Sequence, residues 1–185
     1  KNHFFTKLEK SANLDHSLNL QVINGDKYLK QEKIKSPLID NYSVLHSYYT
    51  LEKSDNDSDF NLGFEVFEDL SKKISDRYEY IYPNFSYKKN LQLEKNINGE
   101  LNFSSDGFQK KYNTNVYEGS LVNDLEYISN EGIIFNGIKS QLTTLLRNVN
   151  TNSENSSDYK ANSDHKILGL LKYDLEFPLK KEDDK

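Results

Sequence analysis

The sequence is marked first by what it lacks: among its 185 residues there is no cysteine, no methionine and no tryptophan. Without cysteine, the segment can form neither a disulfide nor a thiolate metal site. Without methionine it has no natural start residue, so we expect a fragment or a processed chain. No stretch approaches the roughly 18 apolar residues that a membrane-spanning helix needs. These absences exclude a disulfide-stabilised scaffold and a helical membrane domain.

Motifs of catalysis are also missing. The four histidines lie far apart and do not have the spacing of metal ligands: His3, His16, His46 and His165. There is no glycine-rich phosphate loop and no G-x-S-x-G nucleophile elbow. We therefore expect a protein that is not an enzyme, with no catalytic residues, no cofactor and no metal site.

The chain is polar on average but rich in aromatic residues. Hydrophobic residues make up 35% of it, while 13 tyrosines and 10 phenylalanines supply its aromatic 12%. Disordered chains are poor in aromatic residues, whereas a membrane barrel with a wet interior combines both features. The formal net charge of −5 argues against a nucleic-acid partner. Only Arg77 and Arg147 are arginines among the 24 basic residues.

The longest alternating pattern covers residues 112–149. We expect two long strands there, joined by a turn at residues 129–132. In the first arm Tyr117, Leu121 and Leu125 share one parity, while Glu118 and Asp124 take the other. Successive strand side chains point to opposite faces, so the pattern predicts one apolar and one polar face.

Further strands are predicted along the chain, about eight to ten in all. Residues 60–66 alternate most cleanly, and tyrosines follow at period two over residues 78–82. Pro83 predicts a bulge or a strand end, because proline cannot donate to a ladder. Apolar residues keep one parity from 167 to 179. Residues 64–74 also fit helical spacing, but the alternation upstream makes a helix the weaker interpretation.

Turns and loops separate these strands. Asn24-Gly25-Asp26 and Asn98-Gly99 read as turns, and residues 28–40 read as a connection or an interrupted strand. Residues 150–164 read as a long polar loop, in contrast to the short turn at 129–132. Outer-membrane barrels have short turns on one side and long loops on the other. Strands of about 14 residues exceed the 9–11 that a tilted strand needs to cross a bilayer.

The fold class that we predict is all-β: an antiparallel up-and-down meander that forms part of a transmembrane β-barrel. We expect residues 1–185 to be a fragment of a single barrel domain with no internal boundary. Patterning alone leaves a second interpretation open, a soluble β-sandwich with a long hairpin, since the apolar side of a strand could face either lipid or a protein core.

Three short sequence segments, or phrases, resemble sequences of the LPS-assembly outer-membrane protein family, LptD or OstA. They cover residues 24–29, 76–83 and 121–125. The lysine- and asparagine-rich style suggests an α-proteobacterial branch. The residues that carry the resemblance as structural signatures are Asp26, Tyr28, Leu29, Arg77, Tyr78, Tyr80, Pro83, Asn123 and Asp124.

The resemblance implies an outer-membrane barrel that inserts lipopolysaccharide into the outer leaflet. Its expected partners are lipopolysaccharide, an LptE-like plug lipoprotein and an LptA-like periplasmic bridge, with no nucleic acid. The cysteines of the family's disulfides are absent here. Two other functions stay open: another outer-membrane barrel, such as a porin or receptor, and a soluble secreted β-rich binding module.

Overall fold

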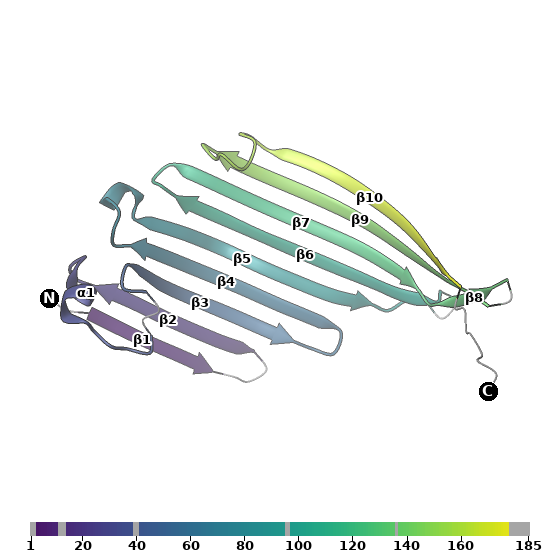
Figure 1. Ribbon diagram of the computed structural model, residues 1–185, viewed down its shortest axis with the longest axis horizontal. Coiled ribbons are helices and arrows are strands. Elements are labelled where there is room, and N and C mark those ends of the chain that lie inside the picture. The colour runs from purple at the N-terminus through teal and green to yellow at the C-terminus, as the bar shows by residue number, and fades with distance from the viewer. Residues whose placement is uncertain (1–2, 11–13, 39–40, 95–96, 136, 178–185) are drawn as a thin grey trace, which may run out of the picture.

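A computed structural model describes residues 3–10, 14–38, 41–94, 97–135 and 137–177. These residues form one antiparallel sheet of ten strands, which follow one another in the order β1-β2-β3-β4-β5-β6-β7-β9-β10, with β8 paired to β9 (Figure 1). The strands are β1 His3–Lys10, β2 Asp15–Ile23, β3 Val44–Ser54, β4 Ser58–Asp69, β5 Tyr78–Leu91, β6 Gly99–Tyr112, β7 Val116–Ser129, β8 Gly132–Ile134, β9 Ile138–Glu154 and β10 Asp164–Glu176.

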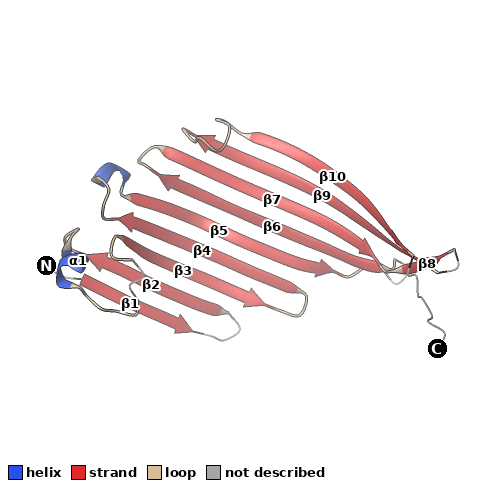
Figure 2. Cartoon of the chain, in the orientation of Figure 1, coloured by secondary structure: helices blue, strands red, loops and turns tan. Residues whose placement is uncertain are grey.

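The helical content is small and lies at one end of the sheet. The helix α1 spans Tyr28–Glu32 and the 3-10 helix η1 spans Ile74–Asp76. Figure 2 shows both at the same end, which we call the α1 end; the opposite end, where β8 lies, is the β8 end. Within the described residues, no helix is long and apolar enough to cross a membrane.

The predicted all-β, antiparallel up-and-down architecture is confirmed, and so are several local expectations. Residues 60–66 lie within β4, so the alternative of a helix over 64–74 was wrong. The β5–β6 pairing shifts register between Ile81 and Asn84, which places the expected bulge at Pro83. Gly25, with φ 121°, lies in the predicted turn, and its carbonyl accepts a hydrogen bond from the Tyr28 N–H at 3.0 Å.

Three expectations need correction. The connection at residues 28–40 contains α1, a five-residue helix that its short sequence pattern did not reveal. The turn after β7 is not a simple four-residue hairpin, because β8 first folds back on the start of β9. Strand β9 runs to Glu154, so the loop predicted over 150–164 is shortened to residues 155–163. The end of the last predicted strand, Leu179, lies outside the described residues.

The only buried apolar cluster among the described residues lies at the α1 end. Leu29 of α1, Leu45 of β3 and Leu70 are 0%, 1% and 7% exposed. Phe5, Ile23, Tyr28 and Ile34 pack around them. The helix therefore caps the end of the first strands, while the long strands beyond it have no buried apolar core.

Candidate functional site

Strand register assigns every side chain of the sheet to one of two faces. On β7, Leu121, Leu125 and Tyr127 point to one face, which we call the apolar face. Asp124 points to the other, which we call the polar face, and so does its partner Arg147 on β9. Because direct cross-strand partners share a face, this assignment of side chains to two faces extends from strand to strand across the sheet.

A row of paired residues across the apolar face changes character along its length. The row begins with Lys53 on β3, passes through apolar rings on β4 and β5, becomes polar on β6, β7 and β9, and ends on an isoleucine. In order, its members are Lys53, Phe60, Tyr87, Ser105, Asn123, Asn148 and Ile167. The apolar surface therefore does not run at right angles to the strands.

A diagonal on the same face remains apolar throughout. It is traced by moving to the paired residue on the next strand and then two residues toward the β8 end. Its members are Tyr49, Leu62, Tyr87, Phe103, Tyr127, Leu142 and Leu175. The apolar face thus carries an oblique apolar band, which we define by this diagonal and its apolar neighbours.

The obliquity of the band can be compared with the geometry of barrels. In a barrel whose strands tilt by 35–45°, points of equal height are displaced by about one to one and a half residues per strand. The row, which moves by zero residues per strand, leaves the apolar band, whereas the diagonal, which moves by two residues per strand, stays within it. The displacement expected for a barrel lies between these two values. Figure 1 shows the matching stagger, because the strand ends at the β8 end are displaced progressively from β1 to β10.

The apolar band is not covered by any other described part of the chain. Phe64 is 42% exposed, Leu146 50% and Leu171 74%. The accessible surface of the chain is 13409 Å². A compact monomer of 21.6 kDa would expose about 9,200 Å². The chain therefore exposes more surface than a compact monomer of its mass, and the large apolar side chains named above contribute to it.

The polar face is hollowed. An open groove of about 490 Å³ lies over β4–β9 and is lined by Lys88, Asn102, Ser104, Glu126 and Arg147 among others. Two smaller hollows on β1–β5 open on the same face. All three hollows are therefore lined by side chains of the polar face.

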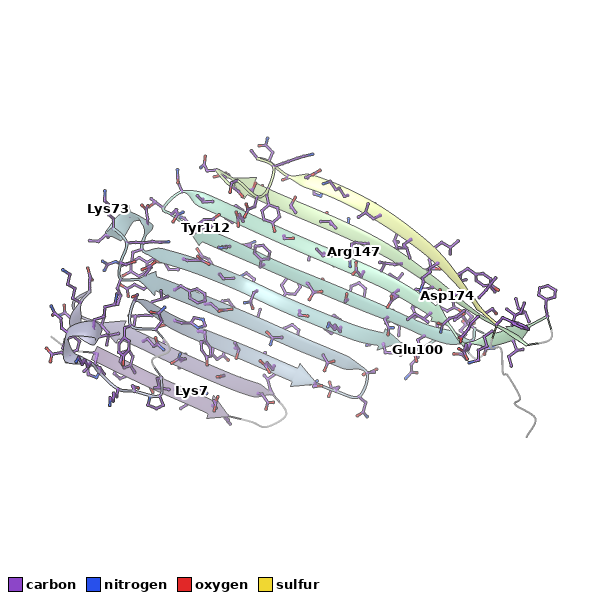
Figure 3. All side chains as sticks on the ribbon, in the orientation of Figure 1. Lys7, Lys73, Glu100, Tyr112, Arg147 and Asp174 are labelled. Carbon is purple, nitrogen blue, oxygen red and sulfur yellow. The ribbon has the colours of Figure 1, made fainter. Side chains whose placement is uncertain are left out.

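Asp124 and Arg147 form a bidentate ion pair in that groove. The Arg147 Nε donates to Asp124 Oδ1 at 2.7 Å, and its second terminal nitrogen donates to Oδ2 at 2.6 Å. Figure 3 shows Arg147 near the middle of the long strands. The planar guanidinium matches the carboxylate geometry, so the pair links β7 to β9 across the polar face.

The second arginine makes an equivalent pair at the α1 end. Arg77, just before β5, donates to both carboxylate oxygens of Asp26 at 2.9 and 2.8 Å. Arg77 also lies 3.5 Å from the Glu68 carboxylate, which accepts a hydrogen bond from the Tyr78 hydroxyl at 3.0 Å. The hydrogen bond from Arg77 lowers the pKa of the Asp26 carboxyl. The cluster joins the β2–β3 connection to β4 and β5.

The structure brings together some predicted signature residues and separates others. Asp26, Arg77 and Tyr78 meet in the cluster just described, and Tyr80 stacks on Tyr78 with ring centroids 5.9 Å apart. Tyr28 and Leu29 belong to the buried cap beside it. Pro83 lies at the β5 bulge.

The remaining two signature residues lie on β7, away from the α1 end. Asn123 faces the apolar side, where its Oδ1 accepts a hydrogen bond from the Ser105 hydroxyl at 2.7 Å. Asp124 faces the polar side. The third phrase therefore belongs to a different region of the sheet from the first two.

Sequence reasoning missed a polar ladder on the apolar face. From Asn123 it continues through Asn148 at 3.3 Å and Asn150 to His165, whose Nδ1 lies 2.8 Å from Asn150 Oδ1. Asn148 and Asn150 alternate with Val149 on β9, so period-two spacing was a usable signal. This ladder forms the border of the oblique apolar band on its α1 side.

A buried carboxylate was also missed. Glu118 is 4% exposed and accepts hydrogen bonds from the hydroxyls of Tyr112 at 2.8 Å and Ser156 at 2.6 Å. Figure 3 places Tyr112 at the α1 end of the sheet. These bonds fasten the 155–163 loop to β6 and β7, so the role of Glu118 is structural.

The described residues contain no group of three or more His, Cys, Asp or Glu side chains placed to hold a metal ion. What the arrangement offers is two extended surfaces, one for apolar material and one for water and polar solutes. No protein-family model and no curated protein matches the sequence.

Proposed function

We propose that this chain is a section of the wall of an outer-membrane β-barrel that takes part in lipopolysaccharide transport and assembly. The observation that carries the proposal is the oblique apolar band. A bilayer cuts a slab at right angles to the barrel axis, and tilted strands cross that slab obliquely. A band with this slope, uncovered and backed by a hollowed polar face, is the pattern that such a wall requires.

A soluble sandwich accounts less well for the same features. Its inner face would be covered by a second sheet about 10 Å away, whereas the apolar face of the described strands has no such cover. Strands β5, β6 and β7 have 14 residues each, which exceeds the 9–11 needed to span lipid. The excess would project beyond the membrane.

The assignment to lipopolysaccharide rests on the resemblance of the three sequence phrases. Two of these phrases fold into one cluster around Arg77 and Asp26, which supports their treatment as a linked unit. In this proposal the work is done by a polar interior and a seam between strands. The partners are lipopolysaccharide, a plug lipoprotein and a periplasmic bridge.

The proposed membrane-embedded wall can be tested by substitution of two adjacent leucines of β9 whose side chains lie on opposite faces of the sheet. Leu146 lies on the apolar face and Leu145 on the polar face, where it pairs with Glu126. An arginine on the lipid side destabilises the barrel, by about 2–4 kcal/mol at the bilayer midplane and by less toward the interfaces. We expect Leu146→Arg to deplete the full-length protein from the outer-membrane fraction, and Leu145→Arg to leave it there. Equal recovery of both variants would contradict the proposal.

The cargo is tested by depletion of the protein in cells. Loss of surface lipopolysaccharide is the expected result. Loss of solute uptake with normal surface lipopolysaccharide would instead indicate a porin or a receptor.

A further inference from the structure

The direction of the edge strands limits how the wall can close. The continuous path β1-β2-β3-β4-β5-β6-β7-β9-β10 contains nine strands, each antiparallel to the next. Eight reversals return the chain to its starting direction, so β1 and β10 both run from the α1 end toward the β8 end (Figure 1).

Strand β8 does not change this count. It pairs with Ile138–Ser140 of β9, on the edge of β9 opposite to the one that β10 occupies, because β10 pairs from Lys139 onward. β8 therefore continues the line of β7 and adds no further width to the sheet.

Direct closure of β10 on β1 would make a parallel pair. Bacterial barrels of a single chain have an even number of strands, all antiparallel. We propose that an odd number of further strands lies between β10 and β1, and that the first of them pairs antiparallel with β10. This inference rests on the proposed barrel.

The sequence of β10 fits an edge that is meant to be paired. Free edges are normally protected by charged residues, proline or short length. The centre of β10 carries apolar side chains on both faces: Leu171 on the apolar face is 74% exposed, and Leu168 and Leu170 on the polar face are 54% and 51% exposed.

The other edge is shorter. β1 has eight residues and carries the exposed Lys7–Glu9 ion pair at 2.7 Å, while β10 has thirteen residues and carries the Lys172–Asp174 pair at 2.8 Å. The longer of the two free edges is therefore that of β10. Its occupant is a strand of similar length with apolar residues on both faces near its centre.

A second copy of this chain is a poorer occupant. Antiparallel pairing of β10 with its own copy requires a two-fold axis perpendicular to the sheet, which would place the two α1 ends on opposite sides of the membrane. A strand that continues the same wall keeps all α1 ends on one side.

The first test is amide hydrogen exchange on the full-length protein in outer membranes. We expect β10 amides to exchange as slowly as those of β9, because both edges of β10 are paired. Fast exchange in β10 beside a slowly exchanging β9 would overturn the inference. Membrane fractionation of the same cells tests the proposed function separately, since inserted protein with a fast-exchanging β10 contradicts only the present inference.

Residues 1–185 contain no cysteine, so cysteines introduced into this segment allow a second test by disulfide trapping. The control pair Phe4→Cys with Val22→Cys should crosslink, because these residues are direct partners in β1 and β2. Leu8→Cys combined in turn with cysteine at Ile167, Leu171 or Tyr173 should form no intramolecular bond. A bond in any of these pairs would show parallel closure, and a Leu171→Cys dimer would show a second copy; either result overturns the inference.

Discussion

At the residue scale, the two arginines do work that lysine could not replace. Each makes a bidentate pair with the aspartate of a signature phrase, Arg77 with Asp26 and Arg147 with Asp124. A lysine ammonium is a point charge and cannot reproduce the two parallel bonds. These two positions are the only arginines among the 24 basic residues, and both make bidentate pairs.

Replacement of Arg77 by lysine is expected to loosen the α1 end. Arg77→Lys should lower the thermal unfolding midpoint and raise hydrogen exchange in the Gly25–Tyr28 turn, because the link from the β2–β3 connection to β5 is lost. Lys73→Arg, at an exposed position before η1, is the control and should change neither. An unchanged midpoint and unchanged turn protection in Arg77→Lys would show that the pair is dispensable.

The same pair predicts a pH dependence. Arg77 lowers the pKa of Asp26 from its ordinary 3.8. A carboxyl with a depressed pKa in the folded state stabilises the fold above its unfolded pKa, and this stabilisation is lost as the pH falls through the folded pKa. Asp26→Asn should therefore destabilise the protein at neutral pH and reduce the loss of stability below about pH 4. Denaturant titrations at several pH values measure this; parallel curves for both proteins would contradict it.

At the element scale, most strands could be predicted from sequence, but their ends and contacts could not. Period-two alternation located β4, β7 and β10 because apolar residues recur at one parity along each strand, although β10 also carries leucines at the other parity. It failed at α1, because a five-residue helix is too short to show a period, and at the end of β9, where asparagines occupy the apolar face. The pairing of Asp26 with Arg77 spans 51 residues and leaves no local signal in the sequence.

The short helix is expected to matter more than its length indicates. Leu29 is fully buried against Leu45 and Leu70. Leu29→Ala should destabilise this end by about 2–5 kcal/mol, as measured by hydrogen exchange of β3 and β4 amides near the α1 end. The control Ile74→Ala, at a side chain 78% exposed, should have an effect within about 0.5 kcal/mol. Equal effects would mean that α1 is not an anchor.

At the scale of the whole molecule, the proposed barrel wall depends on the slope of the oblique apolar band. That slope depends on the register of the seven strands that the row and the diagonal cross, and register is set jointly by turns, bulges and cross-strand pairs. The slope of the band cannot be read from any single sequence segment. For this reason, sequence patterning left both the lipid-facing and the core-facing interpretation open. The two faces could be predicted, whereas the slope could be read only from the assembled sheet.

Spin labels on the cysteine-free chain can measure the slope directly. Along the paired row, labels at Tyr87 should be highly accessible to oxygen dissolved in the bilayer, while labels at Lys53 and Asn148 should contact water. Along the diagonal, labels at Leu62, Phe103 and Leu142 should all have high oxygen accessibility. Uniform accessibility along the row would contradict a membrane slab that crosses tilted strands.

The up-and-down order of the strands has a consequence for biogenesis. Apart from the short β8, which pairs with β9, every strand pairs only with the strand before and the strand after it along the chain, so no pairing has to wait for a distant segment to arrive. Local connectivity of this kind favours rapid folding. A polypeptide delivered from its N-terminus can therefore add each new hairpin to the edge of the sheet already formed, starting from the strands that α1 caps.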